Sequence, residues 1–141
     1  MGSTPSERRA LLELITLDVA SVHHRTTSPL LHLVAGVQPR ATDVELGFLA
    51  FDDHPADVLP RYDDLARWWA IVLSSRGTAH FLDQPDGAPE PIVSTFARSR
   101  DGHEISLLRR GDQLDVLPGR GEGRIPDLLR TLLPTERRAR P

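Results

Sequence analysis

The last third of the chain holds three short segments of strand composition, separated by two tight turns. Residues 91–99, 103–110 and 113–118 are rich in β-branched and other apolar residues. The Asp-Gly pair at 101–102 is favoured in two-residue hairpins, and the Gly-Asp pair at 111–112 marks a second tight turn. Strands joined by connections this short pair antiparallel. The sequence therefore predicts a three-stranded antiparallel meander, and the rest of the fold must be built around it.

Helical patterns are expected at both ends of the chain and in its middle. Thr4, Pro5 and Glu7 form a helix-start signature, and apolar residues then recur at helical spacing through residues 5–23. A leucine-rich helix is predicted over 125–134. The other predicted elements are strands at 30–37, 44–51 and 78–82 and a helix at 60–75.

The resulting order is α-β-β-α-β-β-β-β-α, which predicts an α+β fold in which helices pack on an antiparallel β-sheet. Strand 44–51 carries apolar residues on both of its faces, as expected of a strand covered on both sides or nearly so. We expect a single domain over residues 1–134, followed by a basic, flexible tail at 135–141.

Composition excludes several classes of function. The chain has no cysteine, so disulfides, thiolate metal sites and cysteine nucleophiles are excluded. Its net charge is −3, and its basic residues, all arginine, are scattered, so we expect no nucleic-acid partner. The absence of lysine is typical of a GC-rich bacterial genome. With no long apolar run and no signal-peptide pattern, we expect a cytoplasmic protein that has neither a membrane partner nor a cofactor.

The two tryptophans of the chain, Trp68 and Trp69, are adjacent within the predicted helix 60–75. Neighbouring helical residues point about 100° apart. On a helical projection Trp69 falls inside the apolar arc, whereas Trp68 lies at its margin and Ile71 outside it. Trp68 and Ile71 are therefore expected to form an apolar shoulder. It is either buried between the sheet and a neighbouring helix or exposed as a surface that binds another protein.

A glycine-rich loop precedes the last predicted helix. Glycines at a helix start expose backbone N–H groups, and neighbouring arginines add positive charge, so this loop is a candidate anion site. The pattern is neither a Walker loop nor a full dinucleotide fingerprint, and a flexible connector explains it better. The candidate anion-binding residues are Gly119, Arg120, Gly121, Gly123 and Arg124.

An acidic cluster with one histidine follows the strand 44–51. Asp52, Asp53, His54 and Asp57 could bind a divalent metal ion or provide an Asp-His acid/base pair. The alternative is a solvated turn in which Asp53 caps a short helix that begins at Pro55. The remaining histidines show no metal-ligand spacing, and Ser74 and Ser75 lie in no nucleophile motif.

Residues 93–134, "VSTFARSRDGHEISLLRRGDQLDVLPGRGEGRIPDLLRTLLP", contain a hairpin, a short strand that ends at Leu117-Pro118-Gly119, and a closing leucine-rich helix. This order resembles the C-terminal part of the EspG family, the cytoplasmic chaperones of type VII secretion in actinobacteria. The resemblance implies a non-enzymatic chaperone that holds secretion substrates.

We expect a non-catalytic, protein-binding or chaperone-like module, able to form a homodimer. The alternative is a small-molecule or anion-binding domain, or an enzyme, that uses the loop 119–124 or the cluster 52–57.

Overall fold

The computed structural model describes residues 4–25, 30–61, 65–80, 87–117 and 123–135. These residues form helices, short 3₁₀ turns and strands in the following order: α1 (Pro5–Arg25), β1 (His32–Pro39), β2 (Val44–Phe51), α2 (Pro55–Val58), η1 (Leu59–Arg61), η2 (Leu65–Arg67), β3 (Ala70–Ala79), β4 (Glu90–Ser99), β5 (Glu104–Arg110), β6 (Gln113–Val116) and α3 (Arg124–Leu132).

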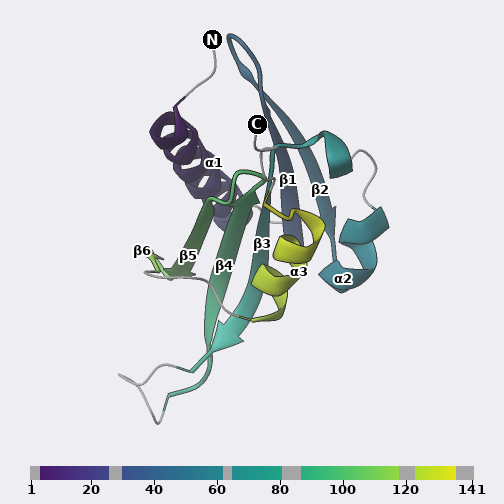
Figure 1. Ribbon diagram of the computed structural model, residues 1–141. Helices are drawn as coiled ribbons and strands as arrows, with labels where there is room; N and C mark the ends of the chain where they lie inside the picture. Colours follow the sequence, from purple (N-terminus) through teal and green to yellow (C-terminus); the bar gives the residue numbers. More distant parts are fainter. Residues whose placement is uncertain (1–3, 26–29, 62–64, 81–86, 118–122, 136–141) are drawn as a thin grey trace.

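The strands form one antiparallel sheet in the order β2-β1-β3-β4-β5-β6. Helix α1 packs on one face of this sheet, mainly over β3, β4 and β5, and α3 packs on the opposite face (Figure 1). The predicted α+β class and the antiparallel meander at the C-terminal end are confirmed. The predicted strands at 30–37, 44–51, 91–99, 103–110 and 113–118 and the two terminal helices are present with ends shifted by no more than two residues.

Successive residues of a strand point to opposite faces, so each face of the sheet builds its own core. The core under α1 contains Ala70 and Val72 from β3, and the core under α3 contains Ile71 and Leu73 from the same strand. Strand β3 therefore contributes to both cores.

The helix predicted over residues 60–75 is wrong. In its place are the short 3₁₀ turns η1 and η2, followed by strand β3 from Ala70. The apolar run after the tryptophans includes β-branched Ile71 and Val72, and both are completely buried, one on each face. A strand buried on both faces has apolar residues at every position, and this pattern resembles that of a buried helix. The predicted strand 78–82 agrees with the structure at residues 78–79, which end β3, and is wrong at residue 80, whereas residues 81–82 lie outside the described residues.

Charged networks attach both terminal helices to the sheet. Glu104 on β5 accepts hydrogen bonds from Arg98, at 2.6 Å, and from Arg130 of α3, at 2.8 Å. The Arg130 guanidinium holds the pKa of the Glu104 carboxyl below its ordinary value. At the other end of the chain, Arg8 of α1 pairs with Asp101 in the β4–β5 turn at 2.7 Å. These contacts fix the orientation of α3 and of the start of α1.

Candidate functional site

Trp68 and Ile71 lie in the core under α3, and neither forms an exposed shoulder. Trp68 is 5% exposed and Ile71 is 0% exposed. The indole packs flat against Gly36 of β1, and the Arg67 guanidinium covers the ring at 4.7 Å from its centroid. The expected exposed surface depended on helical geometry that the chain does not have. Burial between the sheet and neighbouring elements, the other expectation for these residues, agrees with the structure.

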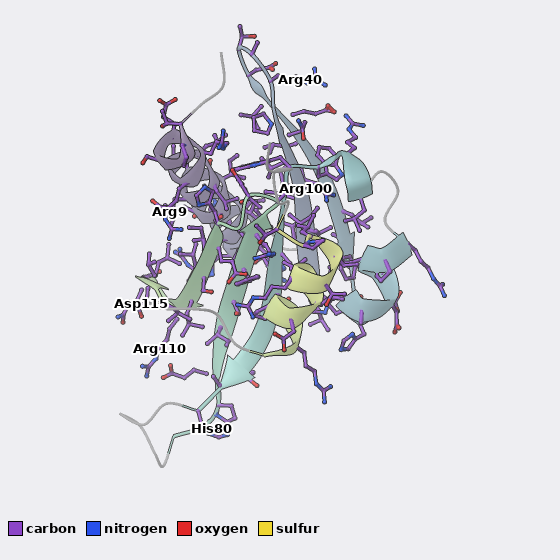
Figure 2. All side chains as sticks on the ribbon, in the orientation of Figure 1. Arg9, Arg40, His80, Arg100, Arg110 and Asp115 are labelled. Carbon is purple, nitrogen blue, oxygen red and sulfur yellow. The ribbon has the colours of Figure 1, made fainter. Side chains whose placement is uncertain are left out.

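Arg100 holds the tryptophan pair in place. Its Nε donates to the Trp68 carbonyl at 2.8 Å, and its Nη2 donates to the Leu65 carbonyl at 3.1 Å. Trp69 turns to the other face, where its indole Nε1 donates to Asp101 at 2.9 Å. Arg100 directly follows β4, and its label in Figure 2 lies at the upper end of the central strands, where its backbone N–H donates to the Trp69 carbonyl at 2.9 Å. Each tryptophan thus belongs to a different core.

The acidic cluster after β2 forms a solvated turn, with all four predicted residues exposed. Asp52 accepts a hydrogen bond from the Leu31 backbone N–H at 2.8 Å. His54, and not Asp53 as expected, is the N-cap of α2, because its Nδ1 accepts from the Ala56 N–H at 3.1 Å. Within the described ranges, no group of three or more histidine, aspartate or glutamate residues could hold a metal ion. The metal site predicted from Asp52, Asp53, His54 and Asp57 therefore has no support in this geometry.

The predicted glycine-loop site is only partly placed. Residues 118–122, which include Gly119, Arg120 and Gly121, lie outside the described residues. Gly123 is the N-cap of α3 with φ of 116°, a backbone conformation that favours glycine. Arg124 is the first residue of α3 and is exposed. The conformation of Gly123 accounts for one glycine of the loop, and the anion site itself stays a prediction.

Histidine and serine side chains meet on both faces of β3, an arrangement that their sequence spacing does not reveal. On the α1 face, the buried His23 Nδ1 lies 2.6 Å from the Ser74 hydroxyl, which also accepts from Thr95 at 3.1 Å. His23 Nε2 lies 3.4 Å from the Leu30 carbonyl, which can only accept. This network fits a neutral ring protonated on Nε2. Burial lowers the pKa of His23, opposed in part by the Leu30 carbonyl.

We expect His23 to make the protein less stable in mild acid. Its ordinary pKa is 6.5, and the folded value is lower, so below that pH the unfolded chain binds a proton that the folded chain excludes. The stability associated with a neutral His23 is fully present above pH 6.5 and is lost as the pH falls. Urea unfolding between about pH 7.5 and pH 5 should show a shallower loss of stability for His23→Gln than for the wild type. Equal slopes would contradict a neutral, buried His23.

The second pair lies on the α3 face, where His32 Nδ1 is 2.7 Å from the Ser75 hydroxyl. The His32 ring packs against Phe51 with centroids 5.3 Å apart, and burial lowers the pKa of His32. A serine beside an imidazole can act as an activated nucleophile. Ser75, however, lies within a strand that is paired on both sides, so its backbone is engaged in the sheet. A serine nucleophile also needs hydrogen-bond donors that stabilise the oxyanion formed during its reaction. Here such donors would have to come from outside β3.

Strand β2 also departs from the predicted burial. Leu46 is 42% exposed, Phe48 is 54% exposed, and Ala50 is exposed on the same face. The register places Phe48 beside Ala35, which is fully buried under α1. The exposed row therefore continues the apolar face of the sheet beyond the helix that covers its other strands. The expectation that β2 is covered on both sides or nearly so is wrong for this face, because α1 packs over the middle of the sheet.

Strand β2 also forms one edge of the sheet. It pairs continuously with β1 over eight residues, without a bulge or a proline. Its single charged residue, Glu45, pairs with Arg40 and Arg67. The opposite edge strand, β6, has only four residues and carries Asp115 near the left margin of Figure 2. Short length and charge protect an edge from further pairing, and β2 has neither protection on its exposed face.

The chain was compared with protein-family models, curated proteins and solved structures, and none of them matches it. The resemblance of residues 93–134 to the EspG family stays a prediction. None of the helices in the described part of the chain combines the length and the apolar composition that a membrane-spanning helix requires.

Proposed function

We propose that the chain is a protein-binding module whose binding element is strand β2, and that the strand pairs with β2 of a second copy. The observation that carries this proposal is the exposed apolar row of Leu46, Phe48 and Ala50 on an eight-residue edge strand. An edge strand offers backbone groups to an incoming strand, and exposed apolar side chains beside it add buried area on association.

The sequence of β2 is complementary to itself. Antiparallel pairing of two copies about Gly47 places Leu46 of each copy opposite Phe48 of the other, and Val44 opposite Ala50. Aliphatic and aromatic side chains opposite one another stabilise a strand pair. Glu45 then faces Leu49, so no like charges oppose each other. The same patch serves both copies, as a twofold symmetric dimer requires.

The sheets of the two copies would be continuous, and the apolar face beside α1 would extend across the junction. Binding of this kind requires no catalytic group, in keeping with a non-catalytic module. An extended segment of a different protein could use the same edge, as a chaperone-like function would require. Self-association is the form that β2 favours, because its own sequence supplies the complementary strand.

Light scattering after size-exclusion chromatography tests the proposal. The wild type should elute with twice the chain mass of 15.7 kDa, and Phe48→Asp with the mass of one chain. The substitution places an unpaired charge in the strand pair and should weaken association at least tenfold, or about 1.4 kcal/mol. The matched control is Leu14→Asp, since Leu14 is 63% exposed on α1, and this variant should remain dimeric.

Thermal unfolding followed by circular dichroism shows whether Phe48→Asp and Leu14→Asp each remain folded. A wild type that keeps the mass of a single chain at about 0.5 mM would overturn the proposal. A dimer that survives Phe48→Asp would overturn it as well, because the contact would then lie on another surface.

A further inference from the structure

A pocket of about 200 Å³ lies at the end of the sheet away from the β4–β5 turn, beside the C-terminal end of α1. Its lining combines the cationic or titratable side chains of His24, Arg76 and Arg109 with the apolar residues Pro91, Ile92 and Val93. None of the described residues that line it is acidic. The pocket is at the same end of the sheet as the labelled His80 and Arg110 in Figure 2.

The sheet register aligns the two arginines. Arg76 of β3 pairs with Val93 of β4, and Val93 pairs with Arg109 of β5. All three therefore form one row across neighbouring strands, on the face that also carries Leu107 under α1. Adjacent strands are about 4.8 Å apart, so the two arginine Cα atoms are about 10 Å apart, with Val93 between them. Two long side chains at this separation can both reach an anion bound above Val93.

The two guanidinium groups differ in their contacts. Arg76 is oriented by α1, since its Nη2 donates to the His23 carbonyl at 2.6 Å. The Nε of Arg109 is buried and has no hydrogen-bond partner within the part of the chain that the structure describes. A buried donor without a partner costs about 1–3 kcal/mol, and a bound ligand is one way in which such a group is satisfied.

We propose that this pocket binds a compact organic carboxylate. The carboxylate would lie over Val93 and accept from Arg109, and a small apolar body would contact Pro91 on the same face of β4. Guanidinium groups suit planar two-oxygen anions, and the apolar lining favours a ligand with a hydrocarbon body over inorganic phosphate. The site lies on β3, β4 and β5 and uses no residue of the predicted loop 119–124.

Titration calorimetry with acetate, butyrate, benzoate and inorganic phosphate tests the assignment. Benzoate should bind at least tenfold more tightly than acetate, with butyrate between them and phosphate weakest. Arg109→Met retains the apolar stem and removes the donors, and it should weaken benzoate binding at least tenfold. Arg9→Ala is the control for loss of one positive charge. Arg9 is near the N-terminal end of α1, away from the pocket, and pairs with Glu13, so this variant should bind as the wild type does.

The Arg109 side chain gives a second measurement. Its Nε–H resonance in a nitrogen-proton correlation spectrum, assigned by its absence in Arg109→Met, should shift on addition of benzoate. Phosphate binding equal to benzoate binding would overturn the choice of ligand. If none of the anions binds at about 20 mM, or if Arg109→Met binds as well as Arg9→Ala, the site itself is overturned.

Discussion

Replacing Trp68 with alanine should lower the free energy of unfolding by about 3–5 kcal/mol, the range typical of removing a large aromatic side chain from a core. Trp68 is 5% exposed and packs with Leu59, Ile71 and the leucines of α3. Its removal leaves a cavity under α3 that the surrounding strands can fill only in part. Urea unfolding followed by circular dichroism measures the change as a lower midpoint.

The size of this effect separates a core residue from a surface residue. A binding residue on an exposed shoulder would change the unfolding free energy by about 0.5 kcal/mol or less. Such a small change would contradict the packing described for Trp68. Trp68→Phe fills part of the cavity and should cost less than Trp68→Ala, which provides a folded variant should the alanine variant be too unstable to purify.

Gly36→Ala should also destabilise the protein, by about 2–3 kcal/mol, because the Trp68 indole already fills the space beside Gly36. A Cβ atom at position 36 would lie 2.4 Å from the Cδ2 and Cε2 atoms of the Trp68 ring. Carbon atoms cannot approach so closely, so the indole or strand β1 must move. The same urea titration measures the loss. Gly77→Ala is the matched control, because it also adds a methyl group to a strand of the sheet, here β3, but this group meets no atom within 4 Å.

The two substitutions should be strongly coupled. Once Trp68→Ala has emptied the space against Gly36, the added methyl group has room, and Gly36→Ala should cost less than about 1 kcal/mol. A double-mutant cycle built from the four proteins gives the coupling energy directly. Additive losses would show that the cost at position 36 comes from the backbone of β1 and not from the indole.

The fold was predictable wherever turns and periodicity agreed. The turns at 101–102 and 111–112 fix the β4–β5–β6 meander, and each of its strands begins and ends within two residues of the predicted positions. Residues 68–73 could not be assigned in this way. They are apolar at every position, and periodicity does not distinguish a strand buried on both faces from a buried helix. Only pairing with β1 and β4, which lie far away in the sequence, decides between the two.

The candidate surfaces were less predictable, for a different physical reason. The pattern of β2 shows two apolar faces but does not show that α1 lies over β3, β4 and β5 and leaves Leu46 and Phe48 uncovered. The arginine pocket depends on register, since Arg76 and Arg109 are 33 residues apart in the sequence and meet only through Val93. The His23–Ser74 pair depends on where α1 lies over the sheet. The His32–Ser75 pair depends on the register between β1 and β3.

The division of the two tryptophans between opposite faces of the sheet has a practical consequence. Trp68 packs in the core under α3, and Trp69 packs against the core under α1. Because the chain has no other tryptophan, each layer of the molecule carries its own fluorophore. Replacing one indole with phenylalanine leaves tryptophan emission from a single layer, so each layer can be followed separately with a probe already built into the chain.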